Sequence, residues 1–162
     1  MDILILVTLG TQDKKFYRLL YELERLKEKN IITEDIIVQA GYSSDFISKH
    51  MKIFDLIPMD DFNKLMKKCS LLITHGGVGS IVDGLKNAKK IIAVARLKKY
   101  GEHTNDHQVQ IIENFSNMGY ILPLYDISKL EKMINKAKTF KPRKYISNTD
   151  NMINLVDELI NS

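Results

Sequence analysis

The sequence predicts an α/β fold: a single Rossmann-like domain in which a parallel sheet of about six strands alternates with helices. Short apolar runs recur along the chain, and each is followed by a segment whose apolar residues have helical spacing. The runs are apolar on both faces, which is typical of strands buried in a parallel sheet. The length of 162 residues suits one domain with a sizeable core.

The expected elements follow from these patterns in chain order. We expect strands at residues 3–8, 36–40, 53–57, 71–74, 91–95 and 120–122. We expect helices at residues 16–26, 62–69, 81–88, 109–118, 127–137 and 148–161. Lys141–Asn148 holds the one hinge that we expect, and it would separate only the last helix from the rest.

Composition and charge exclude several classes of protein. The formal net charge of +4 is mild and the lysines are scattered, so we expect no nucleic-acid partner. The only cysteine, Cys69, is expected to be a buried thiol in a cytoplasmic protein. We interpret the first apolar run as a strand and not as a signal peptide, and no run reaches the roughly 20 residues of a membrane span.

A glycine-rich turn lies between the fourth expected strand and the next helix, in the stretch LLITHGGVGSIVDG. Such a turn brings backbone N–H groups and the positive end of a helix toward an anion. Gly76, Gly77 and Gly79 fit this pattern, with Ser80 placed to cap the helix. The alternative is a tight crossing without a ligand. No Gly-Lys-Ser/Thr is present, so the turn is no P-loop, and Val82 breaks the dinucleotide-binding fingerprint.

Two further features suggest a nucleotide. Asp83 lies one helical turn beyond the glycines, where its carboxylate could bind the hydroxyls of a ribose. An acid in the first helical turn, stabilised by the helix dipole, is the alternative. Gly10, Thr11 and Gln12 follow the first expected strand and could hold a second phosphate, or cap a helix instead. Both loops would lie at the carboxyl edge of the sheet, where open α/β folds bind ligands.

A polar loop, RLKKYGEHTNDHQ, follows the fifth expected strand. Its histidines have an i, i+4 spacing that can bind zinc, but no third ligand is evident, so we expect no metal. We expect these polar groups to bind sugar hydroxyls: Glu102, His103, Asp106, His107 and Gln108. Arg96, Lys98 and Lys99 precede them and would meet a phosphate, a partner or a lipid surface, or else form a solvated basic loop. His75 is the local candidate for a general base, with a structural histidine as its alternative.

The stretches VTLGTQ, LLITHGGVGSIVDGLKNAKKIIAVARLKKYGEHTNDHQ and MGYIL resemble the donor-binding half of glycosyltransferase family 28. Within it, the chain is similar to small catalytic subunits of bacterial capsule and exopolysaccharide glycosyltransferases, and to the catalytic subunit of the eukaryotic dolichol-linked N-acetylglucosamine transferase. The resemblance covers nearly the whole chain. It implies one half of a two-domain GT-B architecture, which binds a UDP-sugar without an essential metal or other cofactor.

The resemblance also implies roles for residues. Backbone N–H groups of the glycine turn would meet the diphosphate, and the segment around Ile57 would hold uracil. Asp83 stands where the family usually has a longer glutamate, and polar residues at the end of the loop would touch the donor sugar. The residues expected to bind the UDP-sugar are Gly10, Thr11, Gln12, Ile57, His75, Gly76, Gly77, Val78, Gly79, Ser80, Asp83, Arg96, Glu102, His103, Asp106, His107 and Gln108.

A GT-B enzyme needs two halves, and this chain resembles one. We therefore expect the donor-binding, catalytic subunit of an inverting transferase, whose acceptor is a lipid-pyrophosphate-linked saccharide in capsule or exopolysaccharide synthesis. A membrane-anchored partner subunit would hold it at the cytoplasmic face. Residues 1–147 would form the UDP-sugar-binding domain. The helix in residues 148–162 would dock on the partner, or else pack on its own domain. One alternative is a non-catalytic nucleotide-sugar-binding regulatory module. Another is a nicotinamide enzyme such as an epimerase, but the broken dinucleotide-binding fingerprint argues against it.

Overall fold

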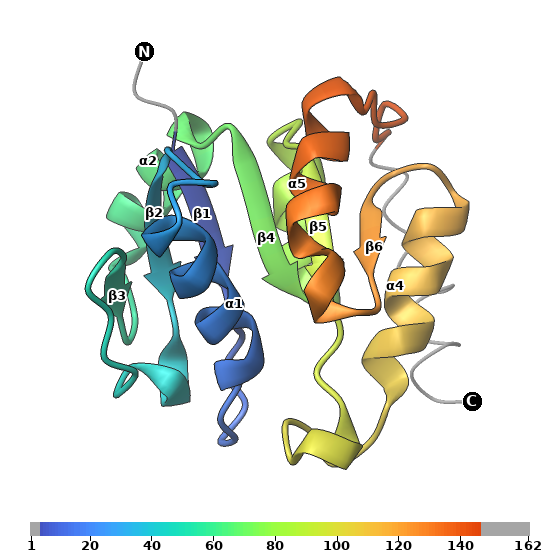
Figure 1. Ribbon diagram of the computed structural model, residues 1–162. Helices are drawn as coiled ribbons and strands as arrows, with labels where there is room; N and C mark the ends of the chain where they lie inside the picture. Colours follow the sequence, from blue (N-terminus) through green and yellow to red (C-terminus); the bar gives the residue numbers. More distant parts are fainter. Residues whose placement is uncertain (1–3, 147–162) are drawn as a thin grey trace.

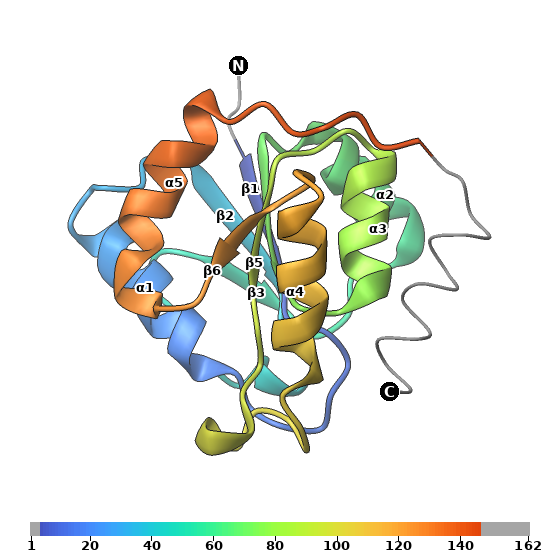
Figure 2. The ribbon, with the colours of Figure 1, turned by 90° about the vertical axis from the view of Figure 1, so that its right-hand side faces the viewer.

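A six-stranded parallel sheet lies between two layers of helices in the computed structural model, which describes residues 4–146 (Figures 1 and 2). The strands are β1 (Leu4–Thr8), β2 (Asp35–Gln39), β3 (Lys52–Phe54), β4 (Leu71–His75), β5 (Ile91–Val94) and β6 (Leu122–Leu124). The helices are α1 (Tyr17–Glu28), α2 (Met59–Lys68), α3 (Val78–Lys86), α4 (His107–Asn117) and α5 (Leu130–Thr139). This arrangement confirms the predicted α/β class.

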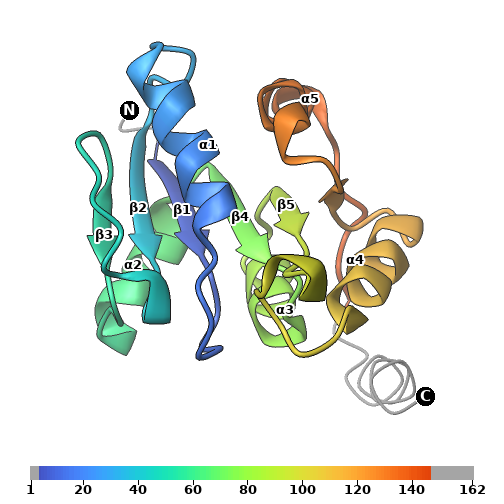
Figure 3. The same cartoon turned by 60° about the horizontal axis from the view of Figure 1, so that its bottom comes forward.

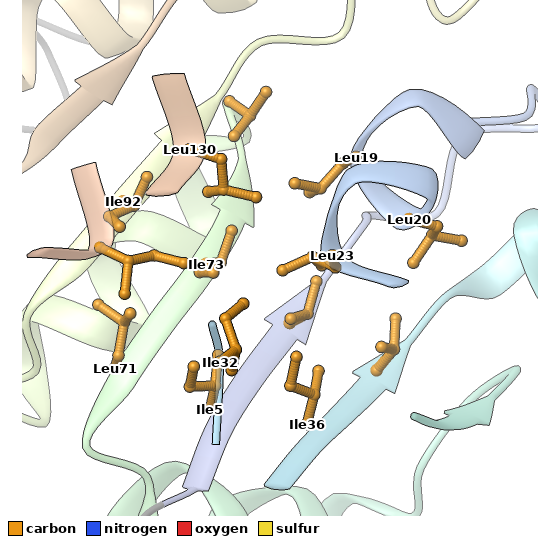
Figure 4. Packing of buried hydrophobic residues seen from close by; sticks show 14 of the residues in the cluster. Ile5, Leu19, Leu20, Leu23, Ile32, Ile36, Leu71, Ile73, Ile92 and Leu130 are labelled. Carbon is orange, nitrogen blue, oxygen red and sulfur yellow. The ribbon is translucent and has the colours of Figure 1, made fainter. Parts of the chain in front are cut away.

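The central strands are apolar along their whole length because helices cover both faces of the sheet. Alternate residues of β1 point to opposite sides, so Ile5 packs under α1 and α5 while Leu6 packs under α2, α3 and α4. On the first face, Leu19 and Leu23 of α1 lie over β1 and β4 (Figure 4). The apolar residues that recur at helical spacing in the sequence therefore form the core.

Both edge strands differ from their predicted positions. The third strand was expected at residues 53–57 and ends at Phe54; the sixth was expected before Pro123, but β6 contains this proline. Pro123 is tolerated because β6 pairs with β5 alone and needs no N–H on its outer side. The segment predicted as a helix at residues 127–137 begins with a 3-10 turn, Ile127–Lys129, and the expected helix at residues 148–161 lies outside the described residues.

Cys69 is buried, as predicted, and its thiol donates to the carbonyl of Met66 at 3.3 Å. Burial raises the pKa of this thiol. Between residues 4 and 146 no helix has the length and apolar character that crossing a bilayer requires.

The strand order β3-β2-β1-β4-β5-β6 reverses its direction of growth between β1 and β4. At such a switch point the loops after the two strands diverge to opposite faces and leave a crevice for a ligand. Figure 3 brings this edge of the sheet toward the viewer: the loop after β1, the start of α3 and the loop before α4 lie along it. The predicted site residues come from these loops.

Candidate functional site

A pocket of about 440 Å³ opens at the switch point. It lies between the loop after β1, the segment that leads into α2 and the amino-terminal part of α3. Its lining residues are Thr8, Gly10, Thr11, Gln39, Leu56, Ile57, Met59, Phe62, Met66, Gly79, Ser80 and Asp83. The structure thus brings together three segments that the sequence singled out separately, and Gly10, Thr11, Ile57, Gly79, Ser80 and Asp83 of the predicted set share one space.

Helix α3 contributes polar groups to this pocket. Gly77 is the N-cap residue, and no side chain caps the helix in the described structure. The backbone N–H groups of the first turn are therefore available to an anion, and the helix dipole favours negative charge there. Ser80 lies within this first turn, so the prediction that it caps the helix is wrong. Asp83 lies in the second turn with an exposed carboxylate, which rules out the first-turn alternative.

The glycines of the turn serve packing more than unusual backbone angles. Gly76, Gly77 and Gly79 all lack a positive φ. A β-carbon at Gly77 would collide with the His75 ring, and one at Gly76 would lie 2.7 Å from the Cβ of Gln108. Gly10 combines a φ of +80° with a close approach to the same ring. Gly79 has open space beside it, so this glycine is the one that leaves room for a ligand.

Arg96, one of the predicted site residues, has a side chain that is 0% exposed and does not line the pocket. The guanidinium donates to the backbone carbonyls of Leu9, Lys14 and Glu102. It thereby ties the loop after β1 to the loop after β5. Burial lowers the pKa of Arg96 to about 10, against the opposing effect of Glu102, so it remains charged at neutral pH.

Glu102 is likewise buried and does not line the pocket. Its carboxylate accepts two hydrogen bonds of 3.1 Å from the guanidinium of Arg18 on α1, and a third from the Leu97 backbone N–H at 3.0 Å. A bidentate pair of this kind is strong and directional. Arg96 and Glu102 thus hold in place the loop that carries the histidines.

Gln108 also bonds to the protein and not to open space. Its amide oxygen accepts from the backbone N–H groups of Gly76 and Arg96, at 3.1 and 3.0 Å. Because that oxygen is fixed by two donors, the amide nitrogen must be the group 3.2 Å from Nδ1 of His75. The Gly76 N–H is consequently occupied, and Gln108 orients the turn from behind.

These bonds set the tautomer of His75. Nδ1 accepts from Gln108, so Nε2 carries the proton and faces the Ser80 hydroxyl at 3.4 Å. Burial, with the nearby positive charge of Arg96, lowers the pKa of His75 to about 4. A neutral imidazole with no free lone pair toward the pocket is a poor general base, so the structure supports the structural alternative for His75.

The remaining polar residues lie in the loop before α4. Asp106 accepts from the Lys98 backbone N–H at 2.8 Å, and Nδ1 of His103 accepts from the Asn105 backbone N–H at 3.2 Å. Burial, together with the charge of Arg96, lowers the pKa of His103. His107 begins α4, at the same edge of the sheet as the pocket. Within residues 4–146, no three His, Cys, Asp or Glu side chains are grouped so that they could hold a metal ion.

Gln12 and Val78 belong to the predicted set but do not line the pocket. Val78 packs its side chain toward the core, so only its backbone could meet a ligand. Because α1 begins at Tyr17, neither Thr11 nor Gln12 caps a helix. Sequence reasoning missed Gln39 among the lining residues. Its signal is a polar residue at the carboxyl end of an otherwise apolar strand, at the edge where ligands bind.

The sequence matches the family described as glycosyltransferase family 28 C-terminal domain over residues 4–161. The chain belongs to this family. A curated relative, the UDP-N-acetylglucosamine transferase subunit ALG13 of Candida albicans (strain SC5314), is 27% identical over 109 residues. The aligned segment is 67% of this chain and 36% of the relative, so the chain spans about a third of that protein's length.

Solved structures show the same fold. The solution structure of ALG13 matches with a TM-score of 0.63 and 17% identity, over 99% of this chain and 98% of that one. The glycotransferase of kitacinnamycin matches with a TM-score of 0.65 and 15% identity, over 85% of this chain but only 35% of the other. This glycosyltransferase family 28 domain therefore has the fold of one half of a GT-B glycosyltransferase, as the sequence predicted.

The buried guanidinium yields a prediction about stability. Replacing Arg96 with methionine leaves two buried carbonyls and one partly buried carbonyl without this donor, so the free energy of unfolding should fall by about 3 kcal/mol or more. Arg25→Met is the matched control, because Arg25 pairs with Glu22 on the surface of α1 and its loss should lower the free energy of unfolding far less. Urea unfolding followed by circular dichroism measures both, and equal losses would contradict the role of Arg96.

The pKa of His75 predicts how stability depends on pH. The folded-state pKa of about 4 lies below the ordinary value of 6.5, so between these values the unfolded state binds the proton more readily. Stability should be complete above pH 6.5 and fall as the pH drops toward 4, by up to about 3 kcal/mol from this residue. In His75→Gln the slope should be shallower, whereas it should be unchanged in His50→Gln, an exposed control. Identical slopes in all three proteins would refute the assignment.

Proposed function

We propose that this chain is the donor-binding, catalytic subunit of a two-component inverting glycosyltransferase. It would transfer a sugar from a UDP-sugar to a lipid-pyrophosphate-linked acceptor in capsule or exopolysaccharide synthesis. The observation that carries the proposal is the pocket at the switch point, where the uncapped start of α3, the Asp83 carboxylate and the Ile57 segment surround one space. The chain's membership of the family of glycosyltransferase family 28 C-terminal domains supports glycosyl transfer as the reaction class.

Each part of the pocket suits one part of a UDP-sugar. The N–H groups of Gly79 and Ser80 favour a diphosphate, and Asp83 can accept hydrogen bonds from ribose hydroxyls. The apolar side chains of Leu56, Met59 and Phe62 suit the flat face of a base. A volume of about 440 Å³ is within the range of small-molecule sites. His107 would reach the donor sugar from the neighbouring loop.

The proposed chemistry relies on electrostatics and on a second subunit. When the acceptor hydroxyl attacks the anomeric carbon, negative charge develops on the leaving diphosphate, and the α3 dipole stabilises it. The Ser80 hydroxyl, with the Nε2–H of His75 behind it, can donate toward the same group. Because His75 is a poor base, we assign the general base that deprotonates the acceptor to the partner subunit.

The second half of the active site would come from a membrane-anchored partner at the cytoplasmic face. A GT-B enzyme closes its cleft with two halves, and this chain matches 35% of the kitacinnamycin glycotransferase. The Candida albicans relative bears the name of a transferase subunit. The docking element predicted from the sequence at residues 148–162 lies outside the described residues. The competing reading remains a non-catalytic nucleotide-sugar-binding module that regulates its partner.

Calorimetric titration of the full chain tests the donor site. UDP should bind, and TDP and NAD should bind more weakly or not at all. Asp83→Ala should weaken UDP binding about 10-fold or more, because charge-assisted hydrogen bonds to the ribose are lost. Glu131→Ala, which removes a carboxylate from α5, should leave the affinity unchanged. An affinity for UDP that is indifferent to Asp83 would argue against this placement of the nucleotide.

A transfer assay separates the enzyme from the regulatory module. The chain alone should not move radiolabelled sugar from a UDP-sugar to lipid, whereas the chain co-expressed with its partner should. His107→Ala should then reduce transfer more than UDP binding, since this side chain would touch only the sugar. Full transfer by the His107 variant would favour the regulatory module, and full activity of the isolated chain would contradict the two-component proposal.

A further inference from the structure

Gln39 has an unusual position among the residues that line the pocket. It is the last residue of β2, and its backbone is held by neighbours on both sides, paired with Thr8 of β1 and Phe54 of β3. Its carbonyl accepts from the Leu9 backbone N–H at 3.0 Å. The side chain is half-buried and faces the pocket. A functional group at this place is therefore carried by the rigid sheet and not by a loop.

One hydrogen bond fixes how the Gln39 carboxamide is turned. The backbone N–H of Ile57 donates to Oε1 of Gln39 at 2.9 Å. An N–H can pair only with the oxygen of an amide, so this bond excludes the flipped arrangement. The amide nitrogen, Nε2, must then lie on the other side, and no acceptor in residues 4–146 bonds to it. The carboxamide thus offers the pocket two N–H donors on Nε2, while its oxygen is engaged by the Ile57 N–H.

The surroundings indicate which part of a ligand meets these donors. Leu56, Met59 and Phe62 flank Ile57 in the sequence, line the pocket and provide apolar surface. The uncapped start of α3 and the Asp83 carboxylate come from a different element and provide polar groups. A ligand that places its phosphates on α3 would bring its base toward Gln39 and the segment around Ile57.

We propose that Gln39 determines base specificity by donating a hydrogen bond from Nε2 to the C4 carbonyl of the nucleotide's base. This inference rests on the proposed function, and deepens it. A pyrimidine with carbonyl groups at its edge, as in uracil, accepts from such a donor. Cytosine presents an amino group in place of one carbonyl, and two donors facing each other leave both unpaired, which is costly in a half-buried site. The hydrogen bond from the Ile57 backbone N–H holds the Gln39 carboxamide in this orientation.

The alternative is that Gln39 has only a structural role and holds the Ile57 segment in position. The variant Gln39→Glu distinguishes this structural role from base recognition. The carboxylate keeps an oxygen that accepts from the Ile57 N–H, so the segment stays held, but its free oxygen is now an acceptor. The substitution thereby replaces a group that pairs with base carbonyls by one that pairs with base amino groups, with almost no change of shape.

Titration of the full chain with UDP and CDP tests the proposal. In Gln39→Glu, UDP affinity should fall about 5- to 100-fold while CDP affinity is retained or improves, so the UDP/CDP affinity ratio falls at least about 10-fold. Gln110→Glu, the same substitution on the exposed side of α4, should leave the ratio unchanged. Gln39→Met is the second variant: it removes both amide groups, and its ratio should also fall.

The outcomes separate this inference from the function on which it rests. Wild-type protein that binds neither nucleotide would contradict the proposed function itself. Wild-type protein that prefers UDP, with the same preference in Gln39→Glu and Gln39→Met, would overturn the inference about Gln39 alone. Equal weakening of UDP and CDP in the variants would show a structural role. Circular dichroism and thermal melting of each variant establish that the affinities compared are those of folded protein.

Discussion

The buried guanidinium of Arg96 is the contact on which the site depends. Its donors reach carbonyls in two loops that follow different strands, Leu9 and Lys14 after β1 and Glu102 after β5. Loops at the carboxyl edge of a sheet are free to vary, and these two must instead be held in register with each other. A single planar cation with several donors can do this, because it satisfies carbonyls that would otherwise be buried without a partner.

A chain of hydrogen bonds between neutral groups connects Arg96 to the pocket. The backbone N–H of Arg96 shares the amide oxygen of Gln108 with that of Gly76, and Gln108 orients the His75 ring. The ring in turn fills the space that the missing β-carbons of Gly10 and Gly77 leave open. Glycine is required here for close packing, and the result is a rigid turn that presents the uncapped start of α3. Preorganised N–H groups of this kind need little rearrangement when an anion binds.

The sequence predicted the fold class, the alternation of elements and the edge of the sheet at which the site lies. These features are local: buried parallel strands are continuously apolar, and a strand-glycine-helix turn has a characteristic pattern. The roles of Arg96 and Glu102 could not be predicted, since RLKKYGE has the composition of a solvated loop and Arg96 is buried by carbonyls more than 80 residues away. The strand containing Pro123 was misplaced because only its position at the sheet edge makes the proline acceptable. Gln39 was missed because its importance comes from a direct hydrogen bond with Ile57, a residue that lies in a different segment of the sequence.

The central claim is that one pocket, at the switch between β1 and β4, receives the nucleotide along the start of α3. Backbone amide NMR of the full chain during titration with UDP tests this most directly, because it locates the ligand without assuming an activity. The account predicts that the largest shifts concentrate at Thr11, Ile57, Gly79 and Ser80, with little change in α5 on the far face of the sheet. Saturable binding with its largest shifts at residues outside this pocket would contradict it.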